Sequence, residues 1–222
     1  MPILRSDFRL RRLDRVAQRP EADDEVVEAD ICDLDAVIGA CRDVRAVIHL
    51  AAQPAEADFR SLLLPRNLEG TWSVYEAAAR VGVARFVFAS TIQTVDGYPT
   101  DVFVSPETPP RPVSVYGCTK LFGEALGRFH ADRSSLGVTC LRIGGVVSRD
   151  DPRLTETRFR SLWCGPNDLA RLIAAAVRSD VRFATVIAVS PPATRRFDTA
   201  NPFGWTPVEE PEEGIVEPEL PS

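Results

Sequence analysis

A tyrosine and a lysine stand four residues apart where the sequence reads Tyr-Gly-Cys-Thr-Lys, at 116–120. On a helix, positions i and i+4 lie on one face, so Tyr116 and Lys120 would stand one turn apart and act on the same substrate. A free phenol has a pKa of about 10, too high for a base at neutral pH, and a nearby ammonium lowers it. The spacing therefore predicts general acid/base catalysis by Tyr116, with Lys120 lowering its pKa.

Two further features favour this chemistry. Lys120 is the single lysine in a chain with 25 arginines. Because an ammonium and a guanidinium differ in shape, hydration and reach, a lone lysine indicates a position where arginine could not replace it. Ser90 and Thr91 follow an apolar run, where a hydroxyl could bind a substrate oxygen beside the phenol. Thr91 is the first candidate and Ser90 the second. The alternative is an ordinary helix-surface pair and a turn after a strand.

Elements that could position these side chains alternate along the chain. Apolar or β-branched runs predict strands at 8–13, 26–29, 46–50, 85–89, 138–143 and 184–189. Helical spacing predicts helices at 34–41, 62–81, 115–133 and 167–177. Strand and helix alternating in this way predict an α/β fold with a doubly wound parallel sheet.

In such sheets, ligands bind beyond the carboxyl ends of the strands. The positions that follow the predicted strands are Asp14, Asp30, Ile31, Ala51, Ala52, Ser90, Thr91 and Gly144. We expect a dinucleotide-binding domain at 1–143 and a small substrate-binding portion at 144–208. A tail at 209–222, rich in proline and glutamate, is expected to be disordered.

Composition excludes several classes of protein. The 222 residues carry a net charge of −6, and the tail holds six of the 32 acidic residues and no basic one, so the body is neutral and offers no basic stripe for nucleic acid. No apolar stretch approaches the roughly 20 residues of a membrane span. Five cysteines without a C-x-x-C pair favour free thiols over a metal site or disulfides, and we expect a cytoplasmic protein.

Short motifs occur in a fixed order along most of the chain. They are L-D-R at 13–15, A-D-I at 29–31, H-L-A-A at 49–52, N-L-E-G-T at 67–71, F-A-S-T at 88–91, Y-G-C-T-K at 116–120 and L-R-I-G at 141–144. Together they resemble the extended short-chain dehydrogenase/reductase superfamily, the NAD-dependent epimerase/dehydratase group, with a Rossmann-like fold. The segments R-F-R-S-L-W at 158–163, N-D-L-A at 167–170 and N-P-F-G-W-T-P at 201–207 are similar to those of uronate dehydrogenases.

The resemblance implies roles for individual residues. Asp14 would bind the adenosine ribose and favour NAD over NADP, because its carboxylate repels a 2'-phosphate. Arg158 would clamp the carboxylate of a uronate-type substrate. Tyr116 and Lys120 would also contact the nicotinamide ribose, and Thr91 would orient the substrate oxygen. The other implied cofactor-binding residues are Asp30, Ile31, Leu50, Ala51, Ala52, Asn67 and Ile143.

The resemblance also implies an opening strand, a glycine-rich turn and a helix, of which at most residues 2–7 remain in this sequence, so an N-terminally truncated sheet is expected. The leading hypothesis is an NAD-dependent oxidoreductase acting on a small sugar or sugar acid. One alternative is a cofactor-poor relative that serves as a binding or regulatory module. Another is a nucleotide-sugar epimerase or dehydratase, although Ile92 and Gln93 supply no extra acid/base pair beside Thr91. Phe122, Leu126 and Phe129 form a packing stripe, and the resemblance implies that their helix lies at a dimer interface, so a homodimer or higher homo-oligomer is expected.

Overall fold

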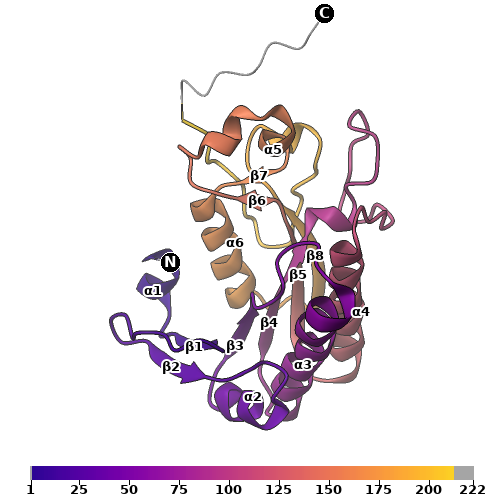
Figure 1. The fold of residues 1–222 in the computed structure, drawn as a ribbon. Coiled ribbons are helices and arrows are strands. Elements are labelled where there is room, and N and C mark those ends of the chain that lie inside the picture. Colours follow the sequence, from indigo (N-terminus) through magenta and orange to yellow (C-terminus); the bar gives the residue numbers. More distant parts are fainter. Residues whose placement is uncertain (1, 213–222) are drawn as a thin grey trace, which may run out of the picture.

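The centre of the molecule is a parallel sheet of four strands. The computed structural model describes residues 2–212. Its sheet has the order β3 (Ala46–His49), β4 (Arg85–Thr91), β5 (Gly137–Ile143) and β8 (Phe183–Ala188), and every neighbouring pair is parallel (Figure 1). The predicted parallel α/β architecture is confirmed. All four strands end at one edge, where Thr91 pairs with Ile143.

Helices cover both faces of this sheet. Alternate residues of β4 point to opposite faces, so Phe86 and Phe88 join one core and Val87 joins the other. The first core lies beneath α2 (Leu34–Cys41), α3 (Gly70–Arg80) and α4 (Val115–Arg133), and the second beneath α1 (Pro2–Asp7) and α6 (Pro166–Arg178). On the outer side of α4, Phe122 and Phe129 are 37% and 48% exposed; a homo-oligomer stays a prediction.

The first two strands form a sheet of their own. Strands β1 (Arg11–Asp14) and β2 (Glu25–Glu28) pair in parallel, but β1 does not pair with β3 within the described residues. Asp24, just before β2, accepts a hydrogen bond from Arg5 of α1 at 2.9 Å and forms an ion pair with Arg12 of β1, also at 2.9 Å. The expected single doubly wound sheet is thus divided into two, because no strand formed by residues 2–212 fills the place in the sheet between β1 and β3.

The long helix expected at 62–81 is in fact two helices. Residues Phe59–Glu69 form a wider π-helix with Pro65 inside it, and α3 begins only at Gly70. Proline lacks the N–H that a regular α-helix needs at an interior position. The change of helix type leaves the Asn67 side chain buried.

A cap of short elements lies over the carboxyl edge of the sheet, above β5 and β8 (Figure 1). It consists of β6 (Gly145–Val146) paired with β7 (Trp163–Cys164), two 3-10 turns (Pro152–Thr155 and Ala193–Arg195) and α5 (Thr157–Arg160). Glu209, expected to be disordered, instead accepts the N–H groups of Asn167 and Asp168 at the start of α6, at 2.7 and 2.8 Å. Residues 213–222 of the predicted tail lie outside the described residues.

Helix α4 is held on the sheet by buried charges. Glu124 Oε1 accepts from the Ser90 hydroxyl at 2.6 Å and from Arg142 Nε at 3.0 Å, and Glu124 Oε2 accepts from Arg142 Nη2 at 2.9 Å. The three side chains are buried. One carboxylate therefore joins α4 to β4 and β5 at the same time.

Removing this carboxylate should destabilise the protein strongly. Glu124→Ala leaves the Arg142 charge buried without its partner, which typically costs about 3–5 kcal/mol. The matched control is Asp132→Ala on the same helix, whose ion pair with Arg128 is exposed and is worth less than about 1 kcal/mol. Urea denaturation of both variants measures the difference, and equal losses would contradict the structural role of Glu124.

Candidate active site

Tyr116, Lys120 and Thr91 lie together at the carboxyl end of β4. Tyr116 and Lys120 occupy the first turns of α4 and face the sheet, where both are buried. Lys120 Nζ lies 5.7 Å from the centroid of the Tyr116 ring and 5.1 Å from that of Phe88. Thr91 lies where its hydroxyl lowers the pKa of the Tyr116 phenol. The structure therefore brings the three residues expected to be catalytic into one place.

The pKa of the Tyr116 phenol moves opposite to the expectation. Burial raises it above its usual value, and the hydrogen bond from Thr91 opposes this shift. Burial also lowers the pKa of Lys120, to about 8. The predicted lowering of the Tyr116 pKa was wrong for this structure because removal of the phenol from water is the largest effect on it.

Several hydrogen bonds fix the start of α4, which carries Tyr116. The Ser114 hydroxyl accepts the Gly117 N–H at 2.9 Å and donates to Gln93 Oε1 at 2.6 Å. Glu56 accepts the backbone N–H of Tyr116 at 3.0 Å, a favourable place for a carboxylate because helix N-termini carry partial positive charge. Serine as N-cap is readable from sequence, whereas Glu56 comes from a loop 60 residues away.

Asn67 is buried and hydrogen-bonded to both of its neighbours in the fold, and its contact with the cofactor stays a prediction. Its Oδ1 accepts the Gln53 N–H at 2.7 Å, and its Nδ2 donates to Thr119 Oγ1 at 3.0 Å. Thr119 in turn donates to the carbonyl oxygen of Tyr116 at 2.7 Å. Asn67 therefore ties the loop after β3 to the helix turn that bears Tyr116.

Ser90 and Arg158 have partners within the protein. The Ser90 hydroxyl donates to Glu124, so Ser90 holds α4 to the sheet, and a contact of Ser90 or Thr91 with the substrate stays a prediction. Arg158 is exposed on α5 and donates from Nη2 to Oδ2 of Asp96. Neither Glu124 nor Asp96 was predicted, because both act through partners distant in sequence.

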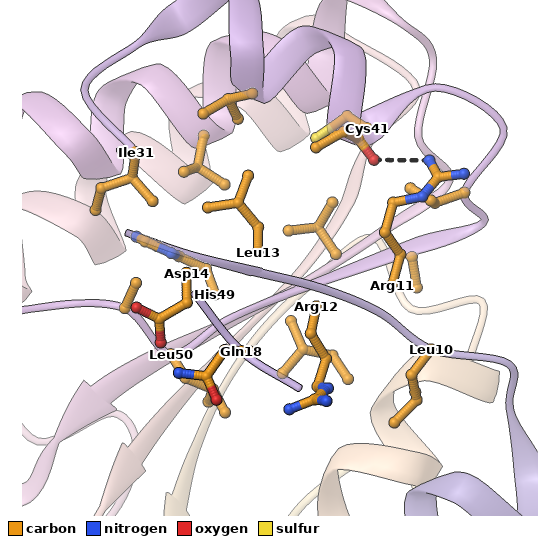
Figure 2. A pocket seen from close by; sticks show the side chains of 18 of the residues that line it. Leu10, Arg11, Arg12, Leu13, Asp14, Gln18, Ile31, Cys41, His49 and Leu50 are labelled. Carbon is orange, nitrogen blue, oxygen red and sulfur yellow. Dashed lines mark hydrogen bonds between the residues drawn. The ribbon is translucent and has the colours of Figure 1, made fainter. Parts of the chain in front are cut away.

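A cavity of about 610 Å³ separates β1 from β3. Four expected cofactor-binding residues line it, namely Asp14, Ile31, Leu50 and Ala51. Figure 2 shows Leu13, Asp14, His49 and Leu50 around this cavity. The other expected cofactor residues do not line it: Ala52 follows Ala51, Asp30 accepts the Cys32 N–H in a turn at 2.9 Å, and Asn67, Tyr116, Lys120 and Ile143 lie elsewhere.

The chemistry of these residues fits the two ends of a dinucleotide. Asp14 is an exposed carboxylate beside partly buried Ile31, which suits a ribose diol and an adenine. Lys120 and Tyr116 suit the second ribose. The sequence has no glycine before Gly39, so no glycine-rich turn of the kind that cradles a pyrophosphate lies ahead of β1 in residues 2–10.

Other kinds of site were searched for in the described part of the chain. No group of histidine, cysteine, aspartate and glutamate side chains in residues 2–212 has the arrangement of a metal site. All five cysteines are free thiols. No helix in the same range is long and apolar enough to cross a membrane.

The buried ammonium of Lys120 should make stability depend on pH. At pH 7 the folded and unfolded states both carry the charge, and burying it costs about 3 kcal/mol for a pKa lowered from 10.5 to about 8. This cost falls as pH rises through 8 towards 10.5. Lys120→Met should therefore be more stable than the parent at pH 7, and the difference should shrink by most of that cost at pH 10. Urea denaturation at both pH values measures it; a constant difference would contradict the pKa of about 8.

Known proteins resemble this chain over most of its length. Residues 4–179 match the NAD dependent epimerase/dehydratase family. An L-arabinose 1-dehydrogenase (NAD(P)(+)) from Haloferax volcanii is 36% identical, and the match covers 68% of this chain and 67% of that protein. A uronate dehydrogenase from Pseudomonas syringae pv. tomato is 32% identical, and the match covers 84% of this chain and 68% of that protein. The crystal structure of a uronate dehydrogenase mutant from Agrobacterium tumefaciens, complexed with NAD, superimposes with a TM-score of 0.84 at 28% identity and covers 94% of this chain and 78% of its own. The chain therefore belongs to the NAD dependent epimerase/dehydratase family, and the prediction of an NAD-dependent enzyme with a Rossmann-like fold is confirmed.

Proposed function

We propose that the protein oxidises a hydroxyl group of a small sugar or sugar acid, with Tyr116 as the acid/base. The observation that carries this proposal is the burial of Tyr116, Lys120 and Thr91 together, with the Lys120 ammonium 5.7 Å from the centroid of the Tyr116 ring. These groups lie at the carboxyl edge of a parallel sheet, where α/β proteins bind ligands.

Each residue has one task in this chemistry. Thr91 orients the substrate hydroxyl towards the phenol, and Tyr116, in its phenolate form, removes the hydroxyl proton. NAD, when bound, supplies the acceptor for the hydride that leaves the same carbon. Lys120 stabilises the phenolate by its charge while it is protonated, below a pH of about 8. Because burial raises the Tyr116 pKa, the phenolate fraction grows with pH, and so should the rate of oxidation.

The cofactor would span two groups of residues. Asp14, Asp30 and Ile31 would hold the adenosine end, with Leu50, Ala51 and Ala52 next along the β3 edge. Asn67, Tyr116, Lys120 and Ile143 would border the nicotinamide end. The exposed carboxylate of Asp14 favours NAD over NADP because a 2'-phosphate beside it would be repelled.

The substrate class follows from the size of the cap and from the relatives. Within residues 144–208, the short elements β6, β7 and α5 lie over the carboxyl edge, whereas α6 and β8 belong to the central fold; we assign the short elements to substrate binding. This compact cap suits a monosaccharide better than a nucleotide sugar. The relatives named above act, by their names, on L-arabinose and on uronates.

Substitution of the phenol tests the mechanism. Tyr116→Phe should lower kcat for oxidation of a sugar panel by about 10²–10⁴-fold, the usual contribution of a general acid/base group, while NAD binding remains. Tyr98→Phe is the matched control, because the Tyr98 hydroxyl donates to the carbonyl of Pro109 on an exposed loop. NADH absorbance measures turnover, and calorimetric titration measures binding.

Two outcomes would contradict the proposal. Undiminished NADH production by Tyr116→Phe would remove the phenol from the mechanism. No heat and no stability shift with millimolar NAD in the parent protein would instead favour the binding or regulatory module.

A further inference from the structure

A buried carboxylate lies between two arginines just beyond the proposed catalytic threonine. Asp96 follows the short turn Ile92–Thr94, whose N-cap is Thr91. Its Oδ1 accepts from Arg196 Nη1 at 2.7 Å, and its Oδ2 accepts from Arg158 Nη2. The Asp96 side chain is only 3% exposed. Both of its oxygens are therefore engaged within the protein.

The two arginines differ in their access to solvent. The Arg196 side chain is 8% exposed, whereas that of Arg158 is 56% exposed. Arg158 belongs to α5, and the next residue, Phe159, packs so closely on Gly145 that a Cβ there would lie 2.7 Å from its ring. Gly145 follows β5 by two residues, beside the end of β4. Arg158 is thus the cation of this cluster that a substrate at the carboxyl edge would meet.

Asp96 is needed by Arg196 whether or not a substrate is present. Besides Asp96, Arg196 donates from Nη2 to the carbonyl of Tyr98 at 2.8 Å, and its buried Nε has no hydrogen-bond partner in the described chain. A carbonyl does not neutralise a guanidinium, so Asp96 supplies the only negative charge paired with Arg196 among the described residues. Asp96 is consequently fixed in place, with its second oxygen on Arg158.

A substrate carboxylate gains little at such an arginine. To form a two-pronged contact with Arg158, it must displace Asp96 Oδ2 or share the guanidinium with it. Displacement exchanges one charge-assisted hydrogen bond for another and leaves a buried carboxylate oxygen unpaired. Sharing places two carboxylates side by side, which is unfavourable. A neutral sugar hydroxyl meets neither penalty.

We propose that Asp96 determines the charge class of the substrate: by occupying Arg158, it makes the site favour a neutral aldose over a uronate. This inference rests on the proposed function and narrows its substrate class. It also differs from the role that the resemblance implied for Arg158. Instead of clamping a substrate carboxylate, Arg158 has its charge already compensated by Asp96.

Asp96→Asn tests the proposal, because asparagine keeps the size and one acceptor oxygen but removes the charge. The substrates are D-glucose with D-glucuronate and D-galactose with D-galacturonate, at saturating NAD. In the parent protein, kcat/KM should be higher for the neutral sugar of each pair. In Asp96→Asn, the acid-to-neutral ratio should rise about tenfold, the size of one charge-assisted hydrogen bond, mainly through KM. Adding Arg158→Gln should abolish that rise.

The single variant Arg158→Gln tests whether Arg158 binds a substrate carboxylate, even if Asp96→Asn does not fold. An acid-to-neutral ratio within about twofold of the parent supports the proposal, whereas a tenfold fall shows that Arg158 clamps a carboxylate in spite of Asp96 and overturns it. A parent enzyme that prefers the acids overturns it as well.

Failure of the proposed function can be told apart from failure of this inference. If the parent oxidises none of the four sugars, that function fails, and saturation-transfer NMR with the same sugars then decides the inference by binding. Stronger acid binding by Asp96→Asn than by the parent supports it, and equal binding overturns it.

Discussion

The buried contact of Glu124 with Arg142 and Ser90 determines where α4 sits, and the site depends on that helix. Tyr116, Lys120 and Glu124 recur every four residues on one face, so the contact that fixes Glu124 on β4 and β5 also fixes the other two. Thr91 directly follows Ser90 on β4. A single carboxylate thus sets the register between the helix that carries the phenol and the strand that carries the hydroxyl.

The same helix face shows a conflict between stability and chemistry. Glu124 is neutralised by Arg142, but Lys120 is buried against the rings of Phe88 and Tyr116. Its charge is also felt at His49, whose pKa is lowered to about 3 by burial first and by Lys120 second. His49 is therefore neutral, and its Nε2 bonds with Thr71 Oγ1 at 3.2 Å, as a satisfied core histidine. Functional sites commonly retain such unfavourable charges.

Local patterns in the sequence were sufficient for most of the elements and for the expectation that Tyr116, Lys120 and Thr91 lie near one another. The bounds of α4 and α2 agree with their prediction, since capping residues and apolar spacing act within a few residues. The pairing of Asp96 with two arginines, the use of Ser90 by Glu124 and the direction of the Tyr116 pKa were not predictable in this way. Each of these depends on contacts between residues far apart in sequence or on burial, and the spacing of residues along the chain gives no information about either. The π-helix at Pro65 was missed although its proline was visible.

The division of the sheet places the two ends of the proposed cofactor site on separate bodies of structure. Asp14 and Ile31 belong to the β1–β2 side of the cavity, whereas Ala51, Asn67 and Tyr116 belong to the side of β3–β8. The β1–β2 side is joined to the rest through the ion pair of Asp24 with Arg5 of α1, at 2.9 Å, and through apolar contacts, not through strand pairing with β3. A dinucleotide that touches both sides would bridge them, and because it binds only the folded arrangement, part of its binding free energy would appear as added stability of β1–β2. A cofactor bound in this way would therefore couple its own affinity to the stability of strands β1 and β2.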